Sequence, residues 1–342
     1  MSNPVLIQDE QHQRLEVKLR RELGDQVLRL LDDDLTEDIL LNPDSSLWAK
    51  RMGHGFSRIG EMPAAQAASA LGTIAAWRGT VLNHEHPILE TELPIDGSRF
   101  EGIVSPVVRQ PVFAIRLRPR KIFSLDDYES DGILTDGTDP LNQLRRRDDF
   151  LDGVRGSKHG DVIRAAVRAR KNILIVGSTG SGKTTLVNAI LDSLARLTPN
   201  DRVISIEDTT ELQCPVENYL DLRAVGGVTM LDCLRACMRL KPTRIVVGEV
   251  RGAEAHTLLK AWNTGHPGGA ATVHANDALS GLIRLESLVA EATNAPQQAL
   301  IAEAVDLVVF VDEESVIKAG RKVREVLLVT GYSNGNYQVE RV

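Results

Sequence analysis

A glycine-rich octapeptide, Gly177-Ser178-Thr179-Gly180-Ser181-Gly182-Lys183-Thr184, constrains the fold of this chain more than any other segment. It satisfies every fixed position of the phosphate-binding pattern G-x-x-x-x-G-K-[ST]. The apolar run Ile173–Val176 precedes it and a helical pattern follows, which is the context that the pattern requires. Glycine lets the backbone curl so that its N–H groups face phosphate oxygens at the positive end of the following helix. The sequence therefore predicts an α/β fold built around a strand, this loop and a helix.

Two side chains of the loop carry its predicted chemistry. Lys183 would neutralise β- and γ-phosphate oxygens, and Thr184 would supply a hydroxyl ligand to Mg²⁺. ATP and Mg²⁺ are therefore the expected cofactors. The alternative, a Gly/Ser turn that happens to contain a lysine, does not account for the strand and helix on either side. The predicted nucleotide-binding residues are Gly177, Ser178, Thr179, Gly180, Ser181, Gly182, Lys183, Thr184 and Thr185.

Four apolar runs alternate with helical stretches after residue 172, as in strands buried on both faces of a parallel sheet. These runs are Ile173–Val176, Val203–Ile206, Ile245–Val247 and Ala270–Val273. Ligands of open α/β sheets bind at the carboxyl ends of the strands. We therefore expect the polar residues that follow these runs to lie near the nucleotide.

Three of the runs end in a carboxylate or a histidine. Glu207 and Asp208 follow the second run, Glu249 the third and His274 the fourth. A carboxylate in this place suits the metal-holding and water-activating position of a phosphate-loop enzyme. Glu249 and Glu207 are both candidates for it. Asp208 is a candidate metal ligand, together with Thr184 and Glu249, and His274 is a candidate γ-phosphate sensor. An acidic strand cap and a structural histidine are the alternatives.

The first 130 residues are predicted to form a separate α+β domain. A three-four leucine repeat over residues 10–41 predicts a helix with one buried face. Pro63 begins an alanine-rich helix that ends near Gly79, and the Asp96-Gly97 pair between apolar runs predicts a hairpin.

Arginines in this first domain form a candidate anion site. The alternation over Phe113–Arg118 would place Arg116 and Arg118 on one face of a strand, and Arg99 after the hairpin turn would join them. The alternative is a solvated face of the sheet.

A linker is predicted at residues 131–149, which are rich in Asp, Gly and Thr and end in Arg145-Arg146-Arg147. The ATP-binding domain is then expected over residues 150–342, with a closing hairpin around Asn334-Gly335.

The net charge and the cysteine content indicate which partners the protein is expected to bind and in which cellular compartment it is expected. The 47 acidic and 40 basic residues give a net charge of −7, which does not favour a polyanion as partner. Three cysteines form no even disulfide framework, which fits a reducing cytoplasm, and Cys233 and Cys237 are expected in the core. The chain has no apolar run near the ~20 residues that a membrane span needs, and it has no export signal. We therefore expect a protein that neither spans a membrane nor is exported. Peripheral attachment to a membrane complex stays open.

Taken in order, the phosphate loop, the Ile206-Glu207-Asp208 box, the Gly248-Glu249-Val250-Arg251 box and the Gly265-His266 and His274 box resemble those of the secretion and traffic ATPases. That superfamily powers type II secretion, type IV pili and type IV secretion. The likeness covers residues 150–290, and the compact length without a tetracysteine insertion is similar to the type IV secretion branch, above all the plasmid conjugal-transfer (Trb-type) ATPases.

This resemblance implies a RecA-like C-terminal domain, a mobile N-terminal domain, and a homo-hexameric ring with nucleotide held between the two domains. Arg99, Arg116 and Arg118 would then clamp the phosphates, because arginine matches their geometry bidentately. Glu249 becomes the preferred catalytic carboxylate, with Glu207 as the competing base. The resemblance further implies a cytoplasmic protein at the inner membrane, bound to inner-membrane components of a secretion or conjugation complex.

Two departures separate this chain from the type II and pilus branches. The signature of those branches has Arg-x-x-Pro-Asp before the strand and Arg-Asp after the glutamate, whereas this chain has Arg239-Leu240-Lys241-Pro242-Thr243 and Arg251-Gly252. A type IV secretion or conjugation motor is thus the leading hypothesis, with a pilus retraction motor as one alternative.

A RecA-like nucleic-acid motor is the other alternative. It would rely on the basic stretches Arg116–Lys121 and Arg145–Arg147, in a chain with only 4% aromatic residues for base stacking. Direct sequence-specific binding of nucleic acid is therefore not expected.

Overall fold

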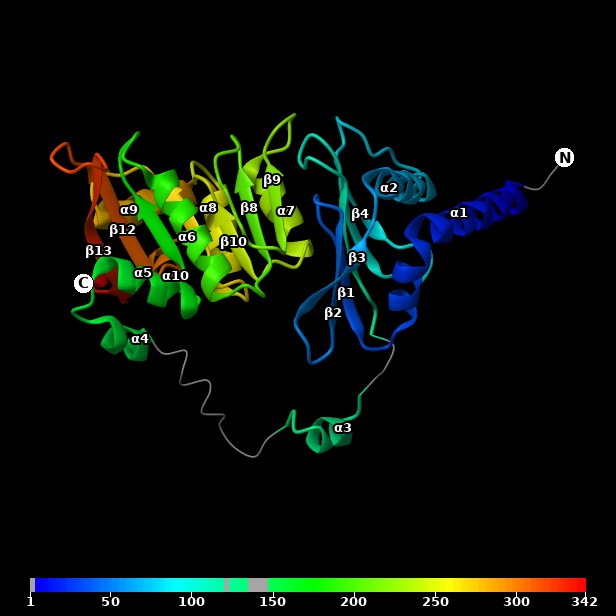
Figure 1. The fold of residues 1–342 in the computed structure, drawn as a ribbon, viewed down its shortest axis with the longest axis horizontal. Coiled ribbons are helices and arrows are strands. Elements are labelled where there is room, and N and C mark those ends of the chain that lie inside the picture. Colours follow the sequence, from blue (N-terminus) through cyan, green and yellow to red (C-terminus); the bar gives the residue numbers. More distant parts are fainter. Residues whose placement is uncertain (1–3, 120–122, 135–146) are drawn as a thin grey trace. The chain divides into compact units, whose positions relative to one another are not determined.

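The computed structural model describes residues 4–119, 123–134 and 147–342 of the chain (Figure 1). Most of the predicted linker, with Arg145 and Arg146, lies outside these residues. The chain divides into two compact units. Unit 1 comprises Met1–Arg120, Asn200–Thr210 and Asn218–Thr243, and unit 2 comprises Lys121–Pro199, Glu211–Glu217 and Arg244–Val342. The domain boundaries expected at residues 130 and 150 stay a prediction.

Unit 1 contains a six-stranded antiparallel sheet with the strand order β3-β2-β1-β6-β5-β4. Helices α1 and α2 pack against each other, and their leucines, alanines and isoleucines form one core with the apolar side chains of the sheet. The elements are α1 (Pro4–Asp32), β1 (Thr36–Leu41), β2 (Ser46–Arg51), β3 (Phe56–Glu61), α2 (Ala64–Arg78), β4 (Ile88–Glu92), β5 (Arg99–Ile103) and β6 (Val112–Arg116).

Two local predictions for unit 1 are confirmed and one is wrong. Helix α2 follows Pro63 and ends at Gly79, which has a left-handed φ of 70°, and β4 and β5 form the expected hairpin. The helix predicted to reach residue 41 is shorter than expected: α1 ends at Asp32, and residues 36–41 form β1. Ile39 and Leu40 pair with strands β2 and β6 on either side, and this burial favours the strand.

A second part of unit 1 comes from later in the chain. Strands β8 (Val203–Glu207) and β9 (Tyr219–Arg223) pair in parallel, and α7 (Met230–Arg239) packs on both. Buried polar contacts join this part to the N-terminal sheet. Arg202 donates to the side-chain oxygen of Asn42 (2.6 Å), and the Lys241 ammonium lies 3.1 Å from the Asp38 carboxylate. A charge that is buried with its partner is costly to separate, so these contacts hold the late segment in unit 1.

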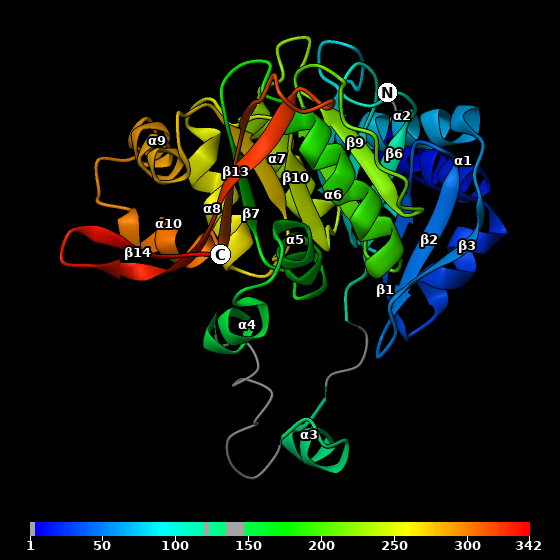
Figure 2. The ribbon, with the colours of Figure 1, turned by 60° about the vertical axis from the view of Figure 1, so that its left-hand side comes forward.

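Unit 2 contains the strands of a mostly parallel sheet, in the order β14-β13-β12-β7-β11-β10. Strand β7 lies between β11 and β12 and runs parallel to both, while β13 and β14 form an antiparallel edge. Helices α5 and α6 pack together, as do α8, α9 and α10 (Figure 2). The elements are α3 (Leu125–Ser130), α4 (Arg147–Val154), α5 (His159–Arg168), β7 (Ile173–Val176), α6 (Lys183–Leu197), β10 (Arg244–Val247), α8 (Glu254–Asn263), β11 (Ala270–Val273), α9 (Ala278–Ala290), α10 (Gln298–Ala304), β12 (Leu307–Glu313), β13 (Arg321–Ser333) and β14 (Asn336–Arg341).

The closing hairpin of unit 2 is also confirmed. Asn334 and Gly335 have φ values of 51° and 77° between β13 and β14, as a two-residue hairpin turn requires. Within the part of the chain that the structure describes, no helix has the length and apolar character to cross a membrane.

Candidate functional site

The glycine-rich loop connects the buried strand β7 to the first turn of α6. Gly180 and Gly182 have φ values of 82° and 95°, a region that side chains other than glycine rarely adopt, and Gly182 caps α6. A Cβ atom on Gly177 would lie 2.3 Å from the Val311 carbonyl oxygen. Glycine is therefore needed at all three positions, and the loop presents the free N–H groups of α6 to an anion.

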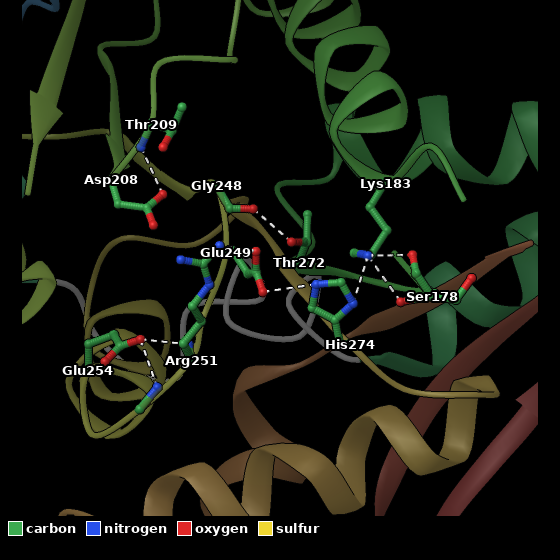
Figure 3. A network of polar contacts seen from close by, with 12 residues as sticks. Ser178, Lys183, Asp208, Thr209, Gly248, Glu249, Arg251, Glu254, Thr272 and His274 are labelled. Atoms are coloured by element: carbon green, nitrogen blue, oxygen red, sulfur yellow. Dashed lines mark hydrogen bonds and ion pairs between the residues drawn. The ribbon is translucent and has the colours of Figure 1, made fainter. Parts of the chain in front are cut away.

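Lys183 is folded back onto its own loop (Figure 3). Its ammonium donates hydrogen bonds to the carbonyl oxygens of Gly177 (3.0 Å) and Ser178 (2.8 Å), and it lies 3.2 Å from Nδ1 of His274. Burial lowers the pKa of Lys183, while the nearby Glu249 carboxylate opposes that shift. With an exposure of only 8%, the lysine is positioned to exchange its carbonyl partners for phosphate oxygens.

A chain of polar contacts continues from Lys183 through His274 to Glu249. Nε2 of His274 lies 3.0 Å from one carboxylate oxygen of Glu249, and Arg251 donates to the other oxygen at 2.7 Å. Because the lysine ammonium can only donate, Nδ1 of His274 accepts and Nε2–H donates to Glu249. Burial tends to raise the pKa of Glu249, but Arg251, His274 and Lys183 together lower it, so the carboxylate is ionised at neutral pH.

The segment that carries Glu249 is held by groups that the sequence analysis did not identify. Thr272 donates through Oγ1 to the Gly248 carbonyl at 2.7 Å, which ties the end of β10 to β11. The Glu254 carboxylate accepts the N–H groups of Arg251 (2.7 Å) and Gly252 (2.9 Å) at the start of α8. The contact of Glu254 with these N–H groups could have been predicted only from the preference for acidic residues in the first turn of a helix.

The remaining predicted site residues, in the first turn of α6 and at the end of β8, make other contacts than Lys183, His274 and Glu249 do. Thr184 lies in the first turn of α6, and the neighbouring Thr185 hydroxyl accepts a hydrogen bond from Arg321 at 2.8 Å. Glu207 is buried at the end of β8 and Asp208 is exposed, with its Oδ1 accepting the N–H of Thr209 at 2.8 Å. Both belong to unit 1, so their roles as base and metal ligand stay predictions.

Two of the three predicted arginines line a basic cavity in unit 1. Arg99 and Arg116 are directly opposite each other on β5 and β6, and Arg118 forms an ion pair with Glu92 (3.0 Å). The first two arginines line a cavity of about 270 Å³. The other lining residues are Phe100, Glu101, Ala114, Met238, Arg239 and Lys241.

Glu101, an acid that the sequence analysis did not identify, is only 3% exposed in this cavity. Burial raises the pKa of Glu101 to about 8, against the opposing effect of the Arg239 guanidinium. The carboxyl group is therefore mostly protonated at neutral pH, and the cavity has an excess of positive charge.

Comparison with known proteins gives consistent matches over most of the chain. The model of the type II/IV secretion system protein family matches residues 152–318. A conjugal transfer protein TrbB of Rhizobium radiobacter is 44% identical over 329 residues, covering 96% of this chain and 94% of that protein. The type IV secretion system protein PtlH of Bordetella pertussis is 34% identical and covers 71% of this chain and 75% of its own length.

A solved structure of similar fold is the VirB11 ATPase of the Brucella suis type IV secretion system, in complex with sulphate. It is 25% identical, covers 93% of this chain and 96% of its own, and has a TM-score of 0.81. The α/β class with a smaller α+β N-terminal domain and a RecA-like ATPase domain is therefore confirmed. This chain belongs to the type II/IV secretion system protein family, as an ATPase of its TrbB and VirB11 group.

Proposed function

We propose that the chain is the ATP-hydrolysing hexameric motor of a type IV secretion or conjugative DNA transfer apparatus, and that it powers pilus assembly or substrate transfer. The observation that carries this proposal is the contact chain from Lys183 through His274 to Glu249 at the phosphate loop. It joins the lysine that binds the terminal phosphates to the carboxylate that would activate water. The 44% identity to a conjugal transfer protein supports the choice of apparatus.

The residues at the loop fit a nucleotide-bound magnesium ion. Mg²⁺ prefers few protein ligands and keeps waters and phosphate oxygens in its shell. The Thr184 hydroxyl and the ionised Glu249 carboxylate provide this kind of oxygen donor, and we retain Asp208 as a further candidate. When bound, the ion would neutralise charge on the β- and γ-phosphates.

Each remaining group of the site then has a defined role. The N–H groups of the loop bind the phosphates, and Lys183 leaves its two carbonyl partners to contact the β- and γ-oxygens. Glu249 orients the attacking water and accepts its proton, with Glu207 as the alternative base. His274 contacts both Lys183 and Glu249, so loss of the γ-phosphate changes the position of the lysine and is transmitted to the carboxylate.

Arg99, Arg116 and Arg118 are proposed as phosphate clamps of the N-terminal domain. Their support is the basic cavity of unit 1, in which Arg99 and Arg116 lie opposite each other while Glu101 is mostly uncharged. Guanidinium groups that lack an equal number of carboxylates favour a bound anion.

As partners we propose further copies of this chain and the inner-membrane components of the apparatus, with the protein at the cytoplasmic face of that membrane. Direct sequence-specific nucleic-acid binding is not part of this function. A gel shift with single- and double-stranded DNA over a range of salt concentrations tests that point. Tight binding with a steep salt dependence would favour a RecA-like nucleic-acid motor instead.

Hydrolysis and assembly of the purified protein test the proposal directly. The wild type should hydrolyse ATP only with Mg²⁺, and Lys183→Ala should reduce the rate by at least about 100-fold, since the loop loses its charged phosphate ligand. With ATP present, the protein should elute as six copies of the 37.5 kDa chain, about 225 kDa. An unchanged rate in Lys183→Ala would refute the assigned site, and a monomer at every ATP concentration would refute the ring.

A further inference from the structure

The hairpin formed by β12 and β13 lies directly against the phosphate loop. The Val311 carbonyl oxygen would be 2.3 Å from a Cβ atom on Gly177, and a carboxylate oxygen of Glu313 would be 3.4 Å from one on Gly180. At the third glycine, Gly182, the nearest atom to a Cβ would be Cδ of Arg321, at 2.5 Å. The end of β12 and the start of β13 thus border the loop along its whole length, within unit 2.

Arg321 is the cationic group of this border. Its Nη1 donates to the Thr185 hydroxyl at 2.8 Å, and its Nε makes a long contact of 3.4 Å with the Ala319 carbonyl. The side chain is exposed, and among the described residues no carboxylate forms an ion pair with it. On the same hairpin, Glu314 pairs instead with Arg324 at 2.8 Å.

The position of this guanidinium adds a cation to a loop that already favours anions. It contacts the first turn of α6, where free N–H groups already create a partial positive charge, and Lys183 begins the same turn. Arg321 is a second cation at this place, and the Glu313 carboxylate is the acidic group of the same border. A bound phosphate group provides the oxygens that a guanidinium fork matches.

The order of residues along α6 indicates which phosphate Arg321 would contact. Lys183 and Thr184 serve the β- and γ-phosphates, while the backbone of such a loop reaches back to the α-phosphate. Thr185 is the next residue in the helix, and Arg321 lies at its hydroxyl rather than at the lysine.

We infer that Arg321 is a nucleotide-binding residue whose guanidinium contacts the α-phosphate of a nucleoside di- or triphosphate at the loop. This inference depends on the proposed binding of ATP. On binding, Arg321 exchanges the Thr185 hydroxyl for phosphate oxygens. The β12–β13 hairpin is thereby coupled to the presence of any nucleotide, whereas His274 responds to the γ-phosphate.

Calorimetric titration of the full chain with ADP and with the non-hydrolysable analogue AMP-PNP, both with Mg²⁺, tests this inference. Arg321→Ala should weaken both nucleotides by a similar factor of about 10 to 100, the range for a lost charge-assisted contact. Arg321→Lys should recover part of the affinity. The matched control is Lys322→Ala, which removes the same charge from the next residue of β13, whose side chain points to the opposite face.

The outcomes separate this inference from the proposed function. If the wild type and Lys322→Ala bind both nucleotides and Arg321→Ala binds them equally well, the role of Arg321 is refuted while the ATPase site stands. A loss for AMP-PNP without a loss for ADP would refute the α-phosphate assignment. If the wild type binds neither nucleotide, the proposed function itself fails.

Discussion

Replacing Glu101 by glutamine should change how the stability of unit 1 depends on pH. Glu101 lies on β5, where it is directly opposite Ala114 on β6 and Glu90 on β4. One of its carboxyl oxygens is buried with no hydrogen-bond partner among the described residues. Burial raises the pKa of this group to about 8 from an ordinary value of 4.5, opposed by the charge of Arg239 and assisted by that of Glu90.

The size of the effect follows from the two pKa values. Between pH 4.5 and about 8 the folded protein holds the Glu101 proton and the unfolded chain does not. The raised pKa therefore contributes stability that is complete below pH 4.5 and is lost as the pH rises through about 8. From pH 6 to the folded-state pKa of about 8 is an interval of about two pH units, and each unit is worth about 1.4 kcal/mol. The free energy of unfolding should therefore fall by ~3 kcal/mol between pH 6 and pH 9 on account of Glu101. Glutamine has the same shape and no proton to lose.

Urea unfolding followed by tryptophan fluorescence measures this loss. The chain has three tryptophans, and in a Trp262→Phe background the signal comes from Trp48 and Trp77, both in unit 1. The difference in unfolding free energy between Glu101→Gln and its parent should increase by ~3 kcal/mol from pH 6 to pH 9. Glu92→Gln, which changes a carboxylate that is 69% exposed on β4, should give a difference that stays flat. Parallel pH profiles for Glu101→Gln and its parent would show that the buried carboxyl is already ionised at pH 6.

Two further predictions concern the proposed catalytic carboxylate and the buried thiols. Glu249→Gln should lower kcat by about 10²- to 10⁴-fold with little change in ATP affinity, because the amide cannot accept a proton; a larger loss of kcat in Glu207→Gln would move the base to that residue. Cys233 and Cys237 are both fully buried, and burial raises the pKa of Cys233 to about 12 and that of Cys237 further still. In a Cys214→Ser variant, which removes the partly buried third thiol, neither Cys233 nor Cys237 should react with Ellman's reagent at pH 8 until urea unfolds the chain, and rapid labelling of that native variant would contradict their burial.

The sequence predicted the elements that local chemistry determines. Gly180 and Gly182 adopt the left-handed conformations that the loop pattern requires, and the Asn334-Gly335 turn joins the expected strands. These features depend on the backbone freedom of one or two residues, so a short segment is enough to predict them. The helix that was predicted to reach residue 41 ends at Asp32, because the three-four repeat stops at Leu31 and the continuous apolar run Ile39–Leu41 is buried in a strand at the centre of the sheet.

The side-chain contacts within the candidate site could not be predicted from the sequence. Glu249 and His274 were placed on one edge of the sheet, but the sequence did not show that His274 bridges Lys183 and Glu249. Arg321 is 136 residues from Thr185 in the chain and belongs to no motif. The raised pKa of Glu101 depends on burial by segments far from it in sequence.

By itself, then, the sequence determined the ligand class and the family, because a phosphate loop and its boxes are local patterns with a direct chemical reason. Only the tertiary structure decided which charges face one another. Distances between side chains from different strands depend on the order and register of the sheet, and both depend on packing over the whole unit. The loop from Gly177 to Thr184 indicates a nucleotide ligand, and the contacts of His274 with Lys183 and Glu249 are the geometry on which the proposed hydrolysis depends.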